Sequence, residues 1–229
     1  MRPDLVIFDC DGVLVDSEPV SNRVLAANLA GYGLTLTLAE CMAHFVGSSM
    51  IGVRDKARSM GAALPEDWID RIYAETYDAL RAGVEVIAGI PALLDALDRA
   101  GIPCCVASNG SDAKMDITLG TTGLASRFDG RRYSAHALGV SKPDPDLFLI
   151  AAAAHGADPS RCLVIEDSPS GAIAARRAGM ACLGYVPEGH EDRLSAEGAT
   201  VIRHMDAVAA HVGLAQAWVS HPARSYGSS

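Results

Sequence analysis

The stretch LVIFDCDGV, residues 5–13, says most about the fold of this chain. Four apolar residues, Leu5–Phe8, run directly into Asp9 and Asp11, two carboxylates that stand two positions apart. An apolar run without polar alternation is typical of a strand that is buried on both faces of a parallel sheet. Ligands of α/β proteins bind at the carboxyl ends of such strands, which is where both acids would lie. An Asp-x-Asp-Gly stretch can equally be an ordinary turn, so the rest of the chain has to decide.

Similar apolar runs recur along the chain, and stretches rich in Ala and Leu at helical spacing separate them. Gly101 and Gly179 stand where two of these stretches end, as C-cap glycines do. Strands that alternate with helices predict an α/β fold with a doubly wound, Rossmann-like parallel sheet. The further strands are expected at 102–107, 162–165, 182–186 and 200–202, and the core helices at 91–100, 112–118, 145–155 and 169–178.

Residues 17–82 interrupt this alternation, because they contain only helical candidates, around 18–30, 38–45, 49–60 and 66–82. We expect an all-helical cap domain inserted after the first strand, with hinges at Asp16–Ser17 and Ala82–Gly83. The expected boundaries are 1–16 and 83–212 for the α/β catalytic core, 17–82 for the cap, and 213–229 for a polar, Gly- and Ser-rich tail that we expect to be disordered.

A second pair of carboxylates, Glu166 and Asp167, comes directly after the apolar run 162–165. With Asp9 and Asp11, it would place four acids in one crevice. Like charges repel by about 4 kcal/mol per pair at roughly 4 Å and an effective dielectric near 20. A hard divalent cation relieves that repulsion, and Mg²⁺ binds carboxylate oxygens together with water and substrate phosphate. The leading hypothesis is therefore a metal-assisted phosphoryl reaction.

Two shorter features could hold the phosphate. Ser108, Asn109 and Gly110 follow the run 102–107 and precede a helix, so their hydroxyl and backbone N–H groups could cradle an anion. An ordinary N-cap would look the same. Lys142 is followed by Pro143 and Pro145 on a short loop. Most lysines are solvated surface charges, but these prolines restrict where this one can point.

Together, these four features resemble, in order and spacing, the four-part signature of the haloacid-dehalogenase-like superfamily, in its phosphatase and β-phosphoglucomutase branch. The resemblance extends to about residue 212 and includes the helical insertion, which is similar to the cap of that branch. The residues that carry it are Asp9-Cys10-Asp11-Gly12-Val13, Ser108-Asn109, Lys142-Pro143 and Glu166-Asp167-Ser168.

This resemblance implies a role for each matching residue. Asp9 would be the nucleophile that forms an aspartyl-phosphate. Asp11 would protonate the leaving alkoxide and then act as the base that activates water. Ser108 and Asn109 would bind the phosphoryl oxygens, and Lys142 would neutralise Asp9 and the phosphate.

The resemblance also implies Mg²⁺ as cofactor and a cap that selects the substrate. Asp9, Asp167 and the backbone carbonyl of Asp11 would bind the metal, with Glu166 as a further ligand. The cap would close over the crevice and exclude bulk water. The residues expected to set the choice of substrate lie in the hinge and in one cap loop: Glu18, Ser21, Gly47, Ser48, Ser49 and Met50.

Three other functions stay open beside a phosphatase. A haloacid dehalogenase needs no acid two residues after its nucleophile, because halide leaves unprotonated, so Asp11 argues against it. β-Phosphoglucomutases carry a His where this chain has Ser21 and an Arg where it has Met50, although Arg54 could substitute from one helical turn later. A non-catalytic phosphate-binding module would be expected to lose an acid or the lysine, and all of them are present.

Composition narrows the partners and the compartment. Among 229 residues, 49% are hydrophobic and 21% charged, as in globular proteins, and the net charge of −9 disfavours nucleic acid and anionic membrane. We find no apolar run of the roughly 18–20 residues that a membrane span requires, and no signal-peptide pattern. The six cysteines form no CxxC pair, which favours reduced thiols in the cytoplasm. We therefore expect a cytoplasmic, monomeric, Mg²⁺-dependent phosphatase of small phosphorylated metabolites, sugar or polyol phosphates.

Overall fold

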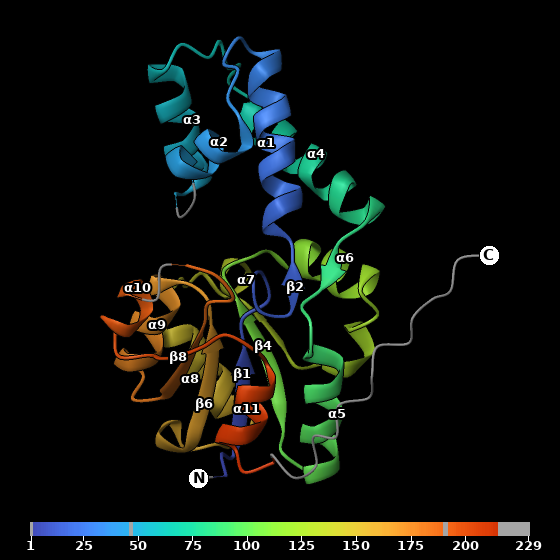
Figure 1. Ribbon diagram of the computed structural model, residues 1–229, viewed down its shortest axis with the longest axis vertical. Coiled ribbons are helices and arrows are strands. Elements are labelled where there is room, and N and C mark those ends of the chain that lie inside the picture. The colour runs from blue at the N-terminus through green and yellow to red at the C-terminus, as the bar shows by residue number, and fades with distance from the viewer. Residues whose placement is uncertain (1, 46–47, 190–191, 215–229) are drawn as a thin grey trace, which may run out of the picture.

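A sheet of six parallel strands lies at the centre of the larger part of the protein, in the order β5-β4-β1-β6-β7-β8 (Figure 1). The computed structural model describes residues 2–45, 48–189 and 192–214. From β1 the chain builds the sheet outward on one side and then on the other, which is a doubly wound topology. The strands are β1 (Leu5–Phe8), β4 (Cys104–Ser108), β5 (Arg132–Ser134), β6 (Cys162–Glu166), β7 (Ala181–Tyr185) and β8 (Thr200–Ile202).

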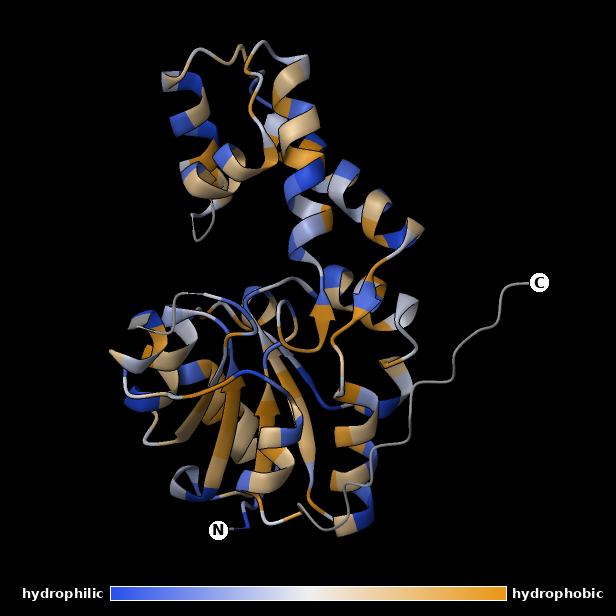
Figure 2. Cartoon of the chain, in the orientation of Figure 1, coloured by the Kyte–Doolittle hydropathy of each residue, from blue (hydrophilic) through white to orange (hydrophobic). Residues whose placement is uncertain are grey.

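Helices cover both faces of this sheet. In β1, Val6 and Phe8 face one hydrophobic core, while Leu5 and Ile7 face the other, as the alternation of a strand requires. The first core includes α5 (Ile90–Ala100), α6 (Asp112–Thr121) and α11 (Asp206–His211); the second includes α8 (Asp146–Ala154) and α9 (Pro169–Arg177). Because both faces are buried, the central strands β1, β4 and β6 are largely apolar, and Figure 2 shows central strands of the sheet in the colours of hydrophobic residues.

The predicted fold class is confirmed: the core is α/β and doubly wound, and an all-helical cap is inserted after its first strand. One strand of the large sheet was not predicted. β5 reads Arg-Tyr-Ser and lies at the edge of the sheet, so it lacks the apolar run by which we recognised the others. The short elements α7 (Ala135–Leu138), α10 (Asp192–Ser195), η1 (Ala125–Phe128) and η2 (Pro159–Arg161) also lie outside the predicted ranges.

The cap has a hydrophobic core of its own. It consists of α1 (Glu18–Gly31), α2 (Leu38–Phe45), α3 (Met50–Ser59) and α4 (Trp68–Ala82), whose apolar side chains pack together. Trp68 is fully buried there, and its indole N–H donates to Asn28 Oδ1 at 2.7 Å. This hydrogen bond satisfies the one polar group of the tryptophan, so the side chain is buried without an unpaired donor.

Two chain crossings connect the cap to the core above the carboxyl ends of the strands (Figure 1). Here β2 (Val15–Asp16) and β3 (Glu85–Val86) pair antiparallel, with Val15 opposite Val86. The helix α4 packs against α6 of the core, and Tyr77 and Ser111 share a hydrogen bond of 2.9 Å. The cap is thus tied to the core through this ribbon and one helix contact.

At the other end of the described chain, Leu214 packs against the core and its N–H donates to Ala209 O at 2.7 Å. The core therefore extends two residues past the predicted boundary at 212, and the remainder of the expected tail, 215–229, lies outside the described residues. Across the part of the chain that the structure describes, no helix has both the length and the apolar character to cross a membrane.

Candidate active site

Three neighbouring strands bring polar residues to one edge of the sheet. Asp9 follows the last residue of β1, Ser108 ends β4, and Glu166 ends β6. Because β1 lies between β4 and β6 and all three are parallel, these side chains meet at the carboxyl edge. The residues predicted from separate parts of the sequence therefore lie together.

Lys142 reaches this edge from the loop between α7 and α8. Its Nζ lies 2.5 Å from Asp9 Oδ1 and 2.5 Å from Glu166 Oε1, and its side chain is only 2% exposed. Burial alone would lower the pKa of Lys142, but the charges of Asp9 and Glu166 outweigh burial and raise it. The ammonium thus stays charged, and the ring of Phe148, whose centroid is 5.0 Å from Nζ, packs beside it.

Glu166 contacts this lysine, and both of its carboxylate oxygens accept hydrogen bonds. Oε1 accepts from Lys142, while Oε2 accepts from the N–H groups of Asp167 and Ser168 and from the Ser168 hydroxyl, at 3.1, 3.0 and 2.8 Å. Both of its oxygens thus accept from protein donors, and its side chain fixes the position of Lys142. The part of Glu166 as a further metal ligand stays a prediction.

Asp167 lies on the other side of Asp9, against the loop that follows β1. A Cβ on Gly12 would come 2.1 Å from Asp167 Oδ2, and Gly12 has a φ of +75°, so only glycine fits there. Burial raises the pKa of Asp167 well above its usual value, and the charges of Asp9 and Glu166 raise it further. Burial likewise raises the pKa of Asp9 to about 7, with Lys142 opposing and Glu166 and Asp11 adding to the effect.

The charges of this cluster fit a divalent cation. The carboxyl groups of Asp9, Glu166 and Asp167 share one ammonium, that of Lys142, and burial together with their mutual repulsion raises the pKa of Asp9 and of Asp167, a strain that a bound cation would relieve. Within residues 2–45, 48–189 and 192–214, no three His, Cys, Asp or Glu side chains converge as metal ligands. The carboxylates of Asp9 and Asp167 are hard oxygen donors, the kind that Mg²⁺ prefers.

The side chain of Asp11 turns away from that cluster and is held by two other groups. Ser17 Oγ donates to Asp11 Oδ1 at 2.5 Å, and Lys114 Nζ lies 2.8 Å from Asp11 Oδ2. Ser17 is the N-cap residue of α1, yet its hydroxyl makes no capping bond to that helix. Its hydroxyl donates to Asp11 instead, so one of the two contacts of Asp11 comes from the residue at which the cap begins.

The loop after β4 is shaped by its own hydrogen bonds. Gly110 N–H donates to Ser108 Oγ at 3.0 Å, and Ser134 Oγ donates to Gly110 O at 2.8 Å. The side chain of Asn109 accepts from the backbone N–H of Lys142 at 3.0 Å. Asn109 thus joins this loop to the loop that carries Lys142.

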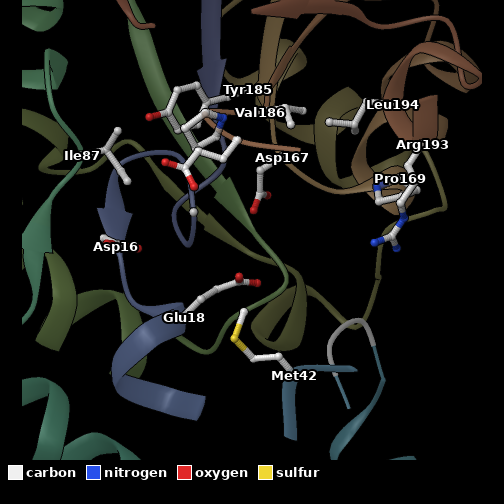
Figure 3. Close-up of a pocket in the computed structure, with 13 residues that line it drawn as sticks. Asp16, Glu18, Met42, Ile87, Asp167, Pro169, Tyr185, Val186, Arg193 and Leu194 are labelled. Atoms are coloured by element: carbon white, nitrogen blue, oxygen red, sulfur yellow. The ribbon is translucent and has the colours of Figure 1, made fainter. Parts of the chain in front are cut away.

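A cavity of about 350 Å³ opens next to Asp167, between the core and the cap. Figure 3 shows Asp167 on the core side, with Glu18 and Met42 on the side of the cap, around the same space. Burial raises the pKa of Glu18, and Asp11 and Asp16 raise it further. The residues that line the cavity are Gly12, Asp16, Glu18, Met42, Ile87, Asp167, Pro169, Tyr185, Val186, Pro187, Glu188, Arg193 and Leu194.

The residues expected to select the substrate are distributed unevenly around this cavity. Glu18 lines it, and Ser21 lies one helical turn further along α1. In the cap loop, Ser48 and Ser49 are exposed, whereas Met50 packs against the core of the cap. Gly47 lies outside the described residues.

The structure also shows Arg54, which could have replaced the missing mutase arginine, in an ion pair of 2.8 Å with Asp55 on its own helix.

Sequence reasoning missed two kinds of residue at this site. Lys114 was not singled out, although its position in the first turn of the helix after Ser108 was a usable signal. Met42, Tyr185 and Arg193 line the cavity, and no local pattern marks them, because they come together only in the folded chain. Their positions depend on how helices and strands that are distant in the sequence pack against one another.

The fold and the site together define an α/β enzyme with a carboxylate and lysine centre beneath a helical cap. The model of the haloacid dehalogenase-like hydrolase family matches residues 3–179, and the chain belongs to that family. It is 30% identical over 206 residues to 6-phosphogluconate phosphatase of Escherichia coli (strain K12), which covers 89% of this chain and 92% of the relative. Hexitol phosphatase B of the same strain is 27% identical over 190 residues, covering 81% and 85%.

Among solved structures, a haloacid dehalogenase family hydrolase from Deinococcus radiodurans R1 with bound phosphate and sodium is 33% identical. Its TM-score is 0.80, and the match covers 94% of this chain and 97% of that one. The likeness therefore extends over the cap as well as the core.

Proposed function

We propose that this protein is a Mg²⁺-dependent phosphatase of small sugar or polyol phosphates that acts through an aspartyl-phosphate on Asp9. The observation that carries the proposal is the contact between Asp9 and Lys142. Lys142 fixes one oxygen of the Asp9 carboxylate at 2.5 Å, in a site where both side chains are buried. An immobile carboxylate with a permanent positive charge beside it suits attack on an anionic phosphate.

The proposed reaction has two steps. The second oxygen of Asp9 attacks phosphorus, and the ester P–O bond breaks. The departing alkoxide takes a proton from Asp11, two residues along the same loop. Water then attacks the aspartyl-phosphate while Asp11 accepts its proton, which releases inorganic phosphate and restores Asp9. General acid–base help of this kind typically contributes about 10²–10⁴-fold.

Other residues bind the phosphoryl group during both steps. The Ser108 hydroxyl and the backbone N–H of Asn109 would bind the anion, and Lys142 would neutralise it. Asp9 and Asp167, with the carbonyl of Asp11, would hold Mg²⁺, which supplies positive charge for the phosphoryl oxygens. The raised pKa values of Asp9 and Asp167, which come from burial and from neighbouring carboxyl groups, support this assignment, because a cation would favour their ionised forms.

The cavity supports a small, hydroxyl-rich leaving group. Its volume of about 350 Å³ is at the lower end of ligand pockets. Asp16, Glu18 and Glu188 line it with carboxylates, which accept hydrogen bonds from hydroxyl groups. The printed names of two relatives, a phosphogluconate phosphatase and a hexitol phosphatase, fit the same chemistry.

Release of inorganic phosphate from a panel of sugar, polyol and nucleotide monophosphates tests this proposal, with and without Mg²⁺. We expect turnover of a few related sugar or polyol phosphates that needs Mg²⁺ and is lost in Asp9→Asn. β-Glucose 1-phosphate with a trace of bisphosphate should show no isomerisation, since Ser21 and Met50 replace the His and Arg of the mutases. Isomerisation without phosphate release would contradict the proposal in favour of a phosphomutase.

A further inference from the structure

Lysine is rare in this chain and is concentrated at the site. The three lysines are Lys56, Lys114 and Lys142, among 19 basic residues in all. Lys142 contacts Asp9, and Lys114 Nζ lies 2.8 Å from Asp11 Oδ2. The two acids of the loop after β1 thus each have an ammonium group of their own.

The side chain of Lys114 is enclosed and is only 22% exposed. Its backbone N–H donates to the hydroxyl of Ser111, the N-cap of α6, at 3.2 Å. That hydroxyl in turn bonds Tyr77 on the cap helix α4 at 2.9 Å, and the rings of Tyr73 and Tyr77 lie 6.1 Å apart on the same helix. Lys114 is therefore fixed by the start of α6 beneath α4, unlike a solvated surface lysine.

The two groups that contact the Asp11 carboxylate, the Ser17 hydroxyl and the Lys114 ammonium, come from different domains. Ser17 stands at the start of α1, the first helix of the cap, and holds Oδ1 at 2.5 Å. Lys114 stands on α6, which belongs to the core together with Asp11. A movement of the cap relative to the core would carry Ser17 with it and leave Lys114 in place. Lys114 is then the partner that Asp11 keeps while its other oxygen becomes free.

We propose that Lys114 is a positioning residue that holds Asp11 by Oδ2, so that Oδ1 is directed to the oxygen of the leaving group. This inference rests on the proposed phosphatase function. A carboxylate held through one oxygen loses rotational freedom, and correct orientation is a large part of what a catalytic group contributes. Lys114 acts through Asp11 and touches neither phosphorus nor the attacking oxygen.

Substrates that differ in their leaving group separate this role from the alternatives. A sugar or polyol phosphate expels a basic alkoxide, which needs a proton, whereas 2,4-dinitrophenyl phosphate expels a stable phenolate, which does not. Since kcat/KM reports only the steps up to departure of the leaving group, it isolates the action of Asp11 as an acid. A residue that binds phosphate or only supports the fold would affect both substrates alike.

The test compares the wild type, Lys114→Met, Lys114→Arg and Asp11→Asn on these two kinds of substrate. We expect Lys114→Met to lower kcat/KM by about 30–100-fold on the sugar or polyol phosphate, which is at or below the lower end of the roughly 10²–10⁴-fold that a general acid contributes, since Asp11 itself is kept. On 2,4-dinitrophenyl phosphate it should stay within about threefold of the wild type. Asp11→Asn should give the same pattern with a larger loss, and Lys114→Arg should recover part of the activity.

Lys56→Met is the matched control, because Lys56 lies on α3, where it donates to His44 O at 3.0 Å within the cap. It should leave both rates unchanged. Equal losses on both substrates, or no loss on either, would overturn the proposal for Lys114 while the phosphatase function stands. If Lys114→Met does not fold, Lys114→Gln takes its place with the same expectation. A wild type without Mg²⁺-dependent phosphate release would instead overturn the proposed function, and the role of Lys114 with it.

Discussion

Gly171 gives the sharpest structural prediction, because the Glu166 carboxyl group occupies the space where a side chain would be. A Cβ built on Gly171 would lie 1.8 Å from the carboxyl carbon of Glu166 and 1.9 Å from Oε1. Gly171 is in the first turn of α9, and its N–H donates to the N-cap Ser168 at 3.1 Å. The helix therefore approaches Glu166 as closely as a glycine permits.

Gly171→Ala forces either α9 or Glu166 to move. If Glu166 leaves Lys142, breaking the buried ion pair costs about 3–5 kcal/mol. If α9 retreats, the overpacking costs about 1–3 kcal/mol. Alanine returns up to about 1 kcal/mol through its higher helix propensity. Because the protein takes the cheaper of the two routes, we expect a net loss of about 1–2 kcal/mol in the free energy of unfolding, hence a melting temperature lower by roughly 2–8 °C.

Urea unfolding followed by circular dichroism measures this loss, and Gly120→Ala is the matched control. Gly120 lies within α6, and a Cβ there would meet nothing within 4 Å. The control should keep or slightly raise stability, by up to about 1 kcal/mol. We also expect phosphatase activity to fall in Gly171→Ala, because Lys142 loses its support. A Gly171→Ala variant as stable as Gly120→Ala would refute the account of Glu166 as the fixed partner of Lys142.

Three further predictions concern the metal, the cap and the thiols. Mg²⁺ at about 100 times its Kd should stabilise the wild type by about 2.7 kcal/mol in a thermal shift assay. Asp167→Asn should remove most of that gain, and an equal gain in the variant would exclude Asp167 as a metal ligand. Trp68→Ala should lower the free energy of unfolding, measured in urea, by about 3–5 kcal/mol, because it leaves a cavity at the centre of the cap. Ile51→Ala should change it little, because Ile51 is 58% exposed. Similar losses in both variants would contradict a hydrophobic core within the cap. Burial raises the pKa of Cys104 to about 11 and that of Cys182 to about 12. The folded protein should therefore resist iodoacetamide at pH 8, whereas the protein unfolded in guanidinium should react at all six cysteines, as measured by mass spectrometry. Rapid labelling of the folded protein would contradict the burial of these thiols.

The central strands could be predicted from the sequence because burial on both faces leaves a local mark. Every residue of β1 is fully buried, and so is nearly all of β4 and β6, which makes each of them an unbroken apolar run. β5 and the ribbon of β2 and β3 carry no such mark. β5 is a half-buried edge strand, and the ribbon strands are two residues long, so pairing with a neighbouring strand and not local composition determines them.

The candidate site divides in the same way. Polar residues at the end of a predicted strand can be placed at the carboxyl edge from sequence, and Asp9, Ser108 and Glu166 lie there. Which donor each acid contacts could not be predicted. Lys114 meets Asp11 across 103 residues of chain, a contact that depends on the phase of α6 over the sheet. Glu166 likewise contacts Lys142 through Oε1, while neighbouring backbone N–H groups donate to its other oxygen, Oε2.

The most direct test of the account is to trap the phosphorylated enzyme. Asp11→Asn should transfer the phosphoryl group to Asp9 and then hydrolyse it slowly, because the base that activates water is gone. The variant, mixed with Mg²⁺ and 2,4-dinitrophenyl phosphate and quenched in acid, is digested and examined by mass spectrometry. The account predicts one phosphoryl group on Asp9 and none when Asp9→Asn is added. A phosphoryl group on Ser108, or full turnover in the Asp9→Asn enzyme, would contradict it.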